Sequence, residues 1–126
     1  MPIIDNNSVK DFNLPGLSHR TFAGPEHGLK NLAVWGQVIE AGAGTPVHRH
    51  DCEEAIVILE GSGTLTINGE ERHFGPNSTL IIPPDAVHQI VNSGTTRMVI
   101  IAALSMAPVK VCHADNRAMP LPWQAS

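Results

Sequence analysis

The stretch from Pro46 to Gly61 reads PVHRHDCEEAIVILEG and combines two patterns. Two histidines stand one residue apart, two glutamates follow them, and an apolar run leads to a closing glycine. Because side chains alternate between the two faces of a strand, His48 and His50 point the same way, roughly 6.6 Å apart along the backbone. Imidazoles at that spacing can converge on one ion.

A carboxylate follows at the start of the apolar run. The residues between His50 and Glu54 are long enough for a short turn, after which Glu54, Ile56 and Ile58 share one face of a strand. We expect that face to be the interior. A carboxylate inside an apolar strand is unfavourable unless it is paired or binds a metal, so the pattern predicts a cation.

A fourth ligand is expected from the segment VHQIVN, in which His88, Ile90 and Asn92 share a face. This segment follows IIPPDA, a proline turn that fixes where the strand begins. Three imidazoles and one carboxylate suit one borderline divalent ion per chain, namely Mn, Fe, Co, Ni, Cu or Zn.

These residues also form two longer motifs. The first has a glycine, five residues, His-x-His, three residues, a glutamate, six residues and a glycine, and it runs from Gly42 to Gly61. The second has Pro83, then His88, then Asn92 after three more residues. Both motifs resemble those of the cupin superfamily, of the small single-domain type. The second motif departs from the pattern in two turns, because Asp85 replaces a glycine and Gly75 lies two residues further from Pro83 than usual.

The resemblance implies an all-β protein, a cupin-type antiparallel jelly-roll β-barrel in a single domain. It implies metal ligation inside the barrel by His48, His50, Glu54 and His88, with structural roles for the motif residues Gly42, Gly61, Gly75, Pro83 and Asn92. Similar proteins are commonly homodimers, and the apolar residues near the N-terminus favour the same expectation.

Strand-like segments with tight turns agree with this fold. They are expected at 32–40, 46–50, 54–60, 64–67, 79–82, 87–92 and 97–104, with one more near 109–112. Asn68–Gly69 is a strong hairpin signal. We divide the chain into an N-terminal arm at 1–30 with at most one short strand, which is a candidate for exchange between subunits, the barrel at 31–112 and a tail at 113–126 that packs on the barrel.

Alternation alone does not assign every residue that lines the pocket. We expect Ile56, Ile58 and Ile90 to face it with the ligands. Either Trp35 and Gln37 or their neighbours Val34, Gly36 and Val38 face it from the preceding strand. Arg97 could offer a cation to an anionic substrate or lie on the surface. The remaining histidines are interpreted as surface residues; they are His19, His27, His73 and His113.

Composition excludes several classes of protein. The net charge of −4, without a basic run, argues against nucleic acid, and no apolar stretch approaches the roughly 18 residues of a membrane span. The N-terminal residues lack the layout of a secretion signal, so a cytoplasmic location is expected. Cys52 and Cys112 are interpreted as free thiols.

Three functions remain open for a small-molecule partner. A Lewis-acid metal could support isomerase, cyclase or lyase chemistry on a small oxygenated molecule, which is the interpretation we favour. A redox-active metal could instead support a dioxygenase that cleaves a chelating enol or diketone. The third alternative is a binding module without catalysis, because a fold does not dictate a function. No catalytic residue beyond the metal ligands can be assigned from the sequence.

Overall fold

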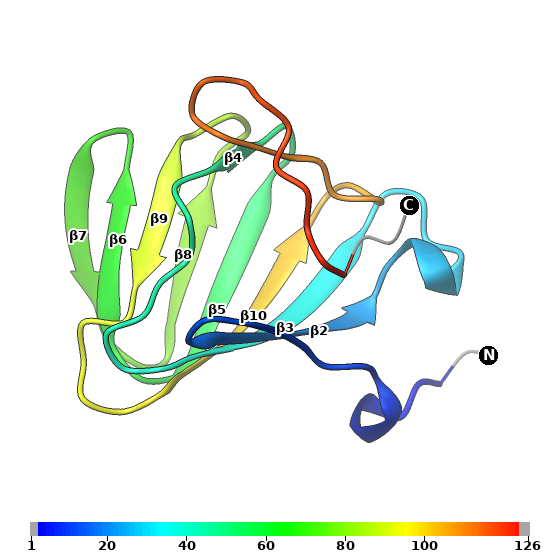
Figure 1. Ribbon diagram of the computed structural model, residues 1–126, viewed down its shortest axis with the longest axis horizontal. Helices are drawn as coiled ribbons and strands as arrows, with labels where there is room; N and C mark the ends of the chain where they lie inside the picture. Colours follow the sequence, from blue (N-terminus) through cyan, green and yellow to red (C-terminus); the bar gives the residue numbers. More distant parts are fainter. Residues whose placement is uncertain (1–2, 124–126) are drawn as a thin grey trace.

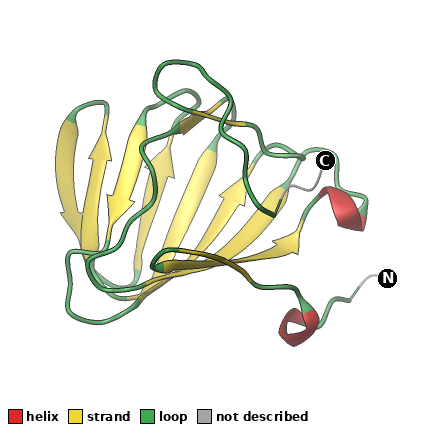
Figure 2. Cartoon of the chain, in the orientation of Figure 1, coloured by secondary structure: helices red, strands yellow, loops and turns green. Residues whose placement is uncertain are grey.

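The computed structural model describes residues 3–123, and nearly all regular structure within them is β-strand (Figures 1 and 2). The strands are β1 (Phe12–Leu14), β2 (Leu17–Ala23), β3 (Ala33–Ile39), β4 (Arg49–His50), β5 (Glu54–Glu60), β6 (Gly63–Ile67), β7 (Glu70–Phe74), β8 (Ser78–Ile82), β9 (His88–Val91), β10 (Met98–Leu104) and β11 (Val111–Cys112). The helical segments are two short 3₁₀ turns, η1 (Asn6–Ser8) and η2 (Pro25–His27).

Three antiparallel sheets form the barrel. The largest has six strands in the order β1-β2-β3-β10-β5-β8, the second has the order β7-β6-β9, and β11 pairs with β4. In Figure 1, β7, β6 and β9 form one side, and the red C-terminal segment passes β4 before it descends toward β2 and β3. The predicted all-β, antiparallel architecture is confirmed.

Alternation along the strands determines which side chains form the core. On β10, Met98, Ile100, Ala102 and Leu104 are buried, and the residues between them are partly exposed. On β3 the buried set includes Trp35, which resolves the orientation that the sequence left open: Trp35 and Gln37 lie on the interior face.

The predicted N-terminal arm needs correction, because its residues 12–23 form two strands rather than at most one short one. β2 is a full strand that pairs with β3 of the same chain, from Leu17 opposite Ile39 to Ala23 opposite Val34. Its inward positions are Leu17, His19 and Thr21, and two polar residues at such positions conceal the alternation. Residues 1–2 of the arm and 124–126 of the tail lie outside the described residues.

The hairpin predicted at Asn68–Gly69 is confirmed and joins β6 to β7. Both residues have positive φ angles, 48° and 83°, as a two-residue turn of type I′ requires. The strand β7 after it was not predicted, because its residues EERHF are exposed or partly exposed and carry no core pattern.

The motif turns also have local explanations. Gly61 has a φ of 89°, and a Cβ there would lie 2.7 Å from the carbonyl oxygen of Arg97, so only glycine fits. Asp85 has a φ of 63°, which explains why the cupin pattern has glycine here. In this chain the Asp85 carboxylate forms an ion pair with the Arg49 guanidinium at 2.5 Å. The surroundings of Gly75 give no reason for a glycine, since nothing lies within 4 Å of its would-be Cβ.

Asn92 is fully buried at the end of β9 and uses its whole amide. Its nitrogen donates to the carbonyl oxygens of Ile39 at 2.9 Å and Thr96 at 2.8 Å, and its oxygen accepts from the Gly94 N–H at 3.0 Å. Both cysteines are free, as predicted. None of the helices in residues 3–123 has the length and apolar character needed to cross a bilayer.

Candidate metal centre

Three histidine rings meet inside the barrel where β4 approaches β9. The backbones of His48 and His88 exchange two hydrogen bonds, of 3.0 and 2.8 Å, and His50 follows on β4. One potential ligand atom from each of the three rings lies within 4.8 Å of the other two. Strand pairing thus brings residues 40 positions apart in the chain to one point.

The outer nitrogens of these rings fix their orientation. Nδ1 of His48 lies 2.7 Å from the Pro46 carbonyl oxygen, and Nδ1 of His88 lies 2.8 Å from that of Ala86. A carbonyl only accepts, so each Nδ1 carries the proton and each Nε2 keeps its lone pair for a metal. His50 differs, because its Nδ1 faces the thiol of Cys52 at 3.8 Å.

Glu54, the first residue of β5, completes the cluster. Its Oε1 lies 3.0 Å from Nε2 of His50 and 3.4 Å from Nε2 of His88. Despite these distances the three atoms are buried without an aligned hydrogen bond. Atoms at about 2.1 Å from a common ion and at right angles would be about 3 Å apart, so the donor set fits a divalent cation.

The environment sets the charges that a metal site needs. Burial alone raises the pKa of the Glu54 carboxyl, but the adjacent rings of His50 and His88 lower that pKa to about 2. Burial, followed by the proximity of His88, lowers the pKa of His48 to about 4. At neutral pH the carboxylate is therefore ionised and the His48 ring is neutral, which is the protonation state of metal ligands.

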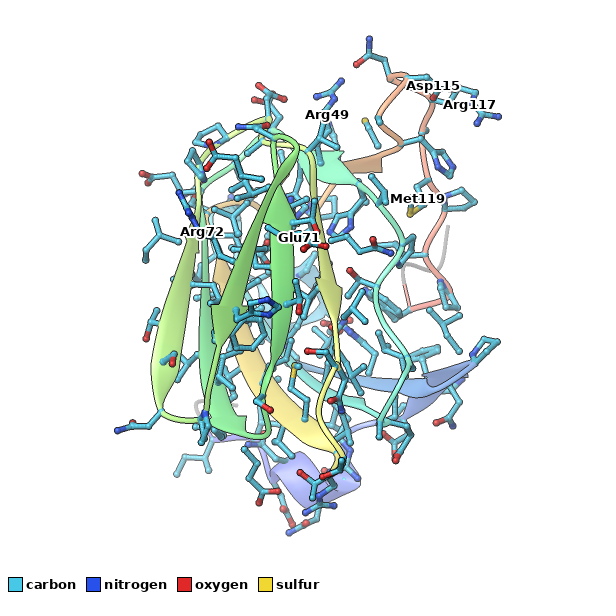
Figure 3. All side chains as sticks on the ribbon, turned by 90° about the vertical axis from the view of Figure 1, so that its left-hand side faces the viewer. Arg49, Glu71, Arg72, Asp115, Arg117 and Met119 are labelled. Atoms are coloured by element: carbon cyan, nitrogen blue, oxygen red, sulfur yellow. The ribbon has the colours of Figure 1, made fainter. Side chains whose placement is uncertain are left out.

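A small, largely apolar cavity of about 60 Å³ opens above the cluster. That volume is below the range of drug-sized sites, so a ligand there must be compact or extend toward the mouth. Its aromatic wall is Trp35 from β3 and Trp123 from the C-terminal tail, whose ring centroids lie 5.4 Å apart. Met119 of the tail also lines the cavity, and Figure 3 shows it on the side of the tail that faces the strands.

The residues predicted to line the pocket separate into two groups. Trp35, Gln37, Ile56 and Ile90 line the cavity together with His48, Glu54 and His88. Ile58 lies in the core, with no exposed surface, and is absent from the lining.

Arg97 is also absent from the lining. Its guanidinium lies outside the barrel, 3.4 Å from the Glu60 carboxylate, and the side chain is 59% exposed. Arg97 therefore does not face this cavity, and of the two roles left open by the sequence the structure places it at the surface.

The interpretation of His19 as a surface residue is wrong. The residue has no exposed surface, and its ring stacks on Trp123 with centroids 3.6 Å apart. The alternation of Leu17, His19 and Thr21 was the available signal. Thr45, Leu121 and Trp123 were missed as lining residues, and for the tail no local sequence pattern could have indicated them.

Comparison with known proteins gives a consistent result. The profile of a family described as auxin binding protein matches residues 2–125. The chain is 38% identical to auxin-binding protein T92 of Nicotiana tabacum over 135 aligned residues, which cover 95% of this chain and 72% of that protein.

Two solved structures share the fold. The polyketide cyclase RemF from Streptomyces resistomycificus has a TM-score of 0.73 at 22% identity, covering 96% of this chain and 87% of its own. A sugar phosphate isomerase of the cupin superfamily from Silicibacter pomeroyi has a TM-score of 0.74 at 21% identity, with coverage of 90% and 82%. These likenesses confirm the predicted cupin-type jelly-roll barrel.

Proposed function

The chain belongs to the auxin-binding protein family, and from this premise and the geometry of the centre we propose that it binds a small aromatic carboxylate at a divalent metal ion. The observation that carries the proposal is a mainly apolar cavity whose polar floor consists of imidazoles and one carboxylate. An ion bound there supplies the positive charge that attracts an anionic oxygen.

The proposed ligands of that ion are His48, His50, Glu54 and His88. Three of their atoms are buried without a hydrogen bond, and such atoms are unfavourable unless a partner is bound. The donor set of nitrogen and oxygen atoms suits Mn, Fe, Co, Ni, Cu or Zn. Elemental analysis of the purified protein identifies the metal and its stoichiometry.

The cavity wall supports binding of an aromatic ring. Trp35 and Trp123 offer aromatic surface, and the rest of the wall is mostly aliphatic. Outside the proposed ligands, Gln37 and Thr45 are the polar side chains among the described lining residues. With Glu54 ionised and engaged in the cluster, these residues provide no side chain suited to general acid catalysis, so we favour binding over turnover.

The test measures ligand binding with and without metal. Metal-loaded protein and protein stripped with a chelator are titrated with phenylacetate and indole-3-acetate by calorimetry. We expect binding by the loaded protein and at least tenfold weaker binding by the stripped protein and by Glu54→Gln. Arg97→Ala is the matched control, because it removes a charge outside the cavity.

Equal binding with and without metal, or none at all, would refute the proposal. Ligand recovered from the titration is also analysed for chemical change. Conversion with loaded protein would instead support the enzymatic alternatives: isomerase, cyclase or lyase chemistry if oxygen is not consumed, and dioxygenase chemistry if it is.

We also propose that the protein is a homodimer that associates through the outer face of the six-stranded sheet. Apart from Glu60, Thr79 is the only polar side chain at the outward positions of β3, β10, β5 and β8. The exposed residues include Leu59 at 50% and Ile81 at 67%. The nearby charges of Arg97 and Arg20 are already paired with Glu60 and Asp11.

A neutral, apolar face fits a second copy of itself better than an anionic membrane or nucleic acid. Light scattering at micromolar concentration measures the mass. A dimer is expected, and a monomer would refute this assignment.

A further inference from the structure

The arginine between the two neighbouring histidines of the cluster connects three separate segments of the chain. His48 lines the cavity and His50 is buried, so Arg49 between them points away from the interior. One guanidinium nitrogen donates to the Asp85 carboxylate at 2.5 Å, and another donates to the side-chain oxygen of Asn116. These two contacts, here called the Arg49 bridge, join β4 to the turn before β9 and to the turn of the C-terminal tail.

The strands that the bridge supports are very short. β4 and β11 are two residues long and pair as Val111 opposite His50 and Cys112 opposite Arg49. The tail turn that follows β11 is closed by the Met119 N–H, which donates to the Val111 carbonyl oxygen at 2.9 Å. A two-stranded hairpin on its own is marginally stable at best in water. Side-chain contacts must therefore contribute to holding this part of the tail on the barrel.

Both acceptors of the bridge stand at backbone positions that favour glycine. Asp85 has a φ of 63° and Asn116 has a φ of 73°. Asparagine and aspartate tolerate this left-handed region better than most residues, but glycine adopts it without steric cost. At both positions the chain carries a side-chain oxygen, and both oxygens accept from the same guanidinium. This agreement supports a role for the side chains and not only for the turn geometry.

The geometry also explains why the donor is an arginine. The Asp85 N–H donates to the His50 carbonyl oxygen at 2.8 Å, so the carboxylate that holds one side of the guanidinium is itself anchored beside β4. The other side of the planar fork is then directed to the tail turn. Figure 3 shows Arg49 at the same end of the molecule as Asp115 and Arg117 of that turn. A lysine, with a single ammonium group, is a poor substitute for a donor of two separate acceptors.

We propose that Arg49 is a positioning residue whose bridge holds the tail turn on β4 and thereby keeps the tail in place along the cavity. The tail residues that follow the turn include Met119 and Trp123, which line the cavity. The consequence for ligands rests on the function proposed above, because a ligand bound there should leave more slowly while the bridge is intact.

Asn116→Gly tests the bridge at an exposed position. Glycine suits the positive φ of this turn, so the change removes the side-chain oxygen without straining the backbone. Hydrogen exchange followed by mass spectrometry compares the amides of 111–119 with those of β10. We expect exchange at 111–119 to be about fivefold faster, because one hydrogen bond that holds the tail turn is lost, and exchange at β10 to be unchanged. Asn77→Gly is the matched control, since it removes another exposed asparagine side chain at a φ of 61°.

Arg49→Met tests whether both acceptors act through the guanidinium. Exchange at 111–119 should be at least as fast as in Asn116→Gly. Adding Asn116→Gly to Arg49→Met should have no further effect, because both changes remove the same contact. Arg49→Lys should not restore the exchange of the wild type. Unchanged exchange in Asn116→Gly, or additive effects in the double variant, would overturn the bridge. Asn116→Gly decides the question alone if Arg49→Met does not fold.

A second measurement connects the bridge to the cavity. Dissociation of phenylacetate from metal-loaded protein, followed by tryptophan fluorescence in a stopped-flow instrument, should be about fivefold faster in Asn116→Gly than in the wild type or Asn77→Gly. Metal content should be the same in all three. Equal dissociation rates would overturn the role of the bridge in keeping the tail along the cavity.

The two measurements separate two failures. Failure of phenylacetate to bind the loaded wild type would overturn the proposed function, whereas the exchange experiment needs no ligand and still decides whether the bridge holds the tail. Unchanged exchange together with normal phenylacetate binding would overturn the bridge and leave the proposed function intact.

Discussion

Each face of the six-stranded sheet departs from the arrangement usual for an antiparallel sheet, which is apolar inside and polar outside. The inner face carries His19, Gln37 and Glu54 among its core residues. The outer face of β3, β10, β5 and β8 carries few polar side chains, although Val57 is 38% exposed and Ile81 is 67% exposed.

The difference teaches that the two faces need different partners. Buried polar atoms without hydrogen bonds fit the proposed small partner, an ion and its ligand. An exposed apolar sheet agrees with the proposed large partner, a second copy of the same sheet. A substitution on the inner face should therefore leave the oligomeric state unchanged, and a substitution on the outer face should leave metal binding unchanged.

The largest effect is expected from His50→Ala, which removes an imidazole from the inner face. Metal affinity should fall by more than about 100-fold, because replacing even a supporting partner of a ligand costs up to that much. Elemental analysis after dialysis measures the change, and His73→Ala on the exposed strand β7 is the matched control. Retention of one ion per chain in His50→Ala would contradict the assignment.

The outer face is tested next by Val57→Asp. Bringing two such carboxylates into an apolar interface is strongly unfavourable, so the protein should become monomeric at micromolar concentration. Val47→Asp makes the same change at a valine of similar exposure, 46% against 38%, away from the six-stranded sheet. Sedimentation velocity compares the two variants, and a dimeric Val57→Asp would place the interface elsewhere. Metal content should be the same in both variants.

A smaller effect concerns the buried ring of His19. Its pKa is lowered from 6.5 to about 3, so the unfolded chain binds a proton that the folded chain excludes. Stability is therefore highest above pH 6.5 and falls as the pH drops toward 3, by at most about 1.4 kcal/mol per pH unit from this residue. Urea unfolding of metal-free protein between pH 7 and 5 should show a steeper fall for the wild type than for His19→Asn. Equal slopes would contradict the assignment of a buried neutral ring.

The smallest effect is expected from Arg97→Ala at the rim of the outer face. Its ion pair with Glu60 is exposed on both sides, so unfolding free energy should change by less than about 0.5 kcal/mol. Ligand affinity should not change, because the guanidinium lies outside the cavity. Calorimetry on the same sample measures both quantities. A tenfold loss of ligand affinity would contradict the placement of Arg97 outside the binding site.

Three of the four proposed metal ligands could be grouped from the sequence because their spacing is local. His48, His50 and Glu54 lie within seven residues, and alternation alone places them on related faces. The cavity wall could not be predicted in the same way. His19 and Thr21 hide the alternation of β2, and the stacking of Trp123 on His19 joins residues more than 100 positions apart. The strand β7 has no alternating pattern of inward apolar residues, so only the Asn68–Gly69 turn before it indicated a strand there.

The proposed ion ligands and much of the cavity wall come from different segments of the chain. The former lie at 48–54 and 88, while the aromatic and amide groups of the wall lie at 35–37 and 123. Such a separation makes the barrel easy to adapt. A mutant library confined to the wall segments would change which small molecules bind, while every variant kept the same proposed metal ligands. Related genes could diverge in ligand preference by substitutions in the same segments.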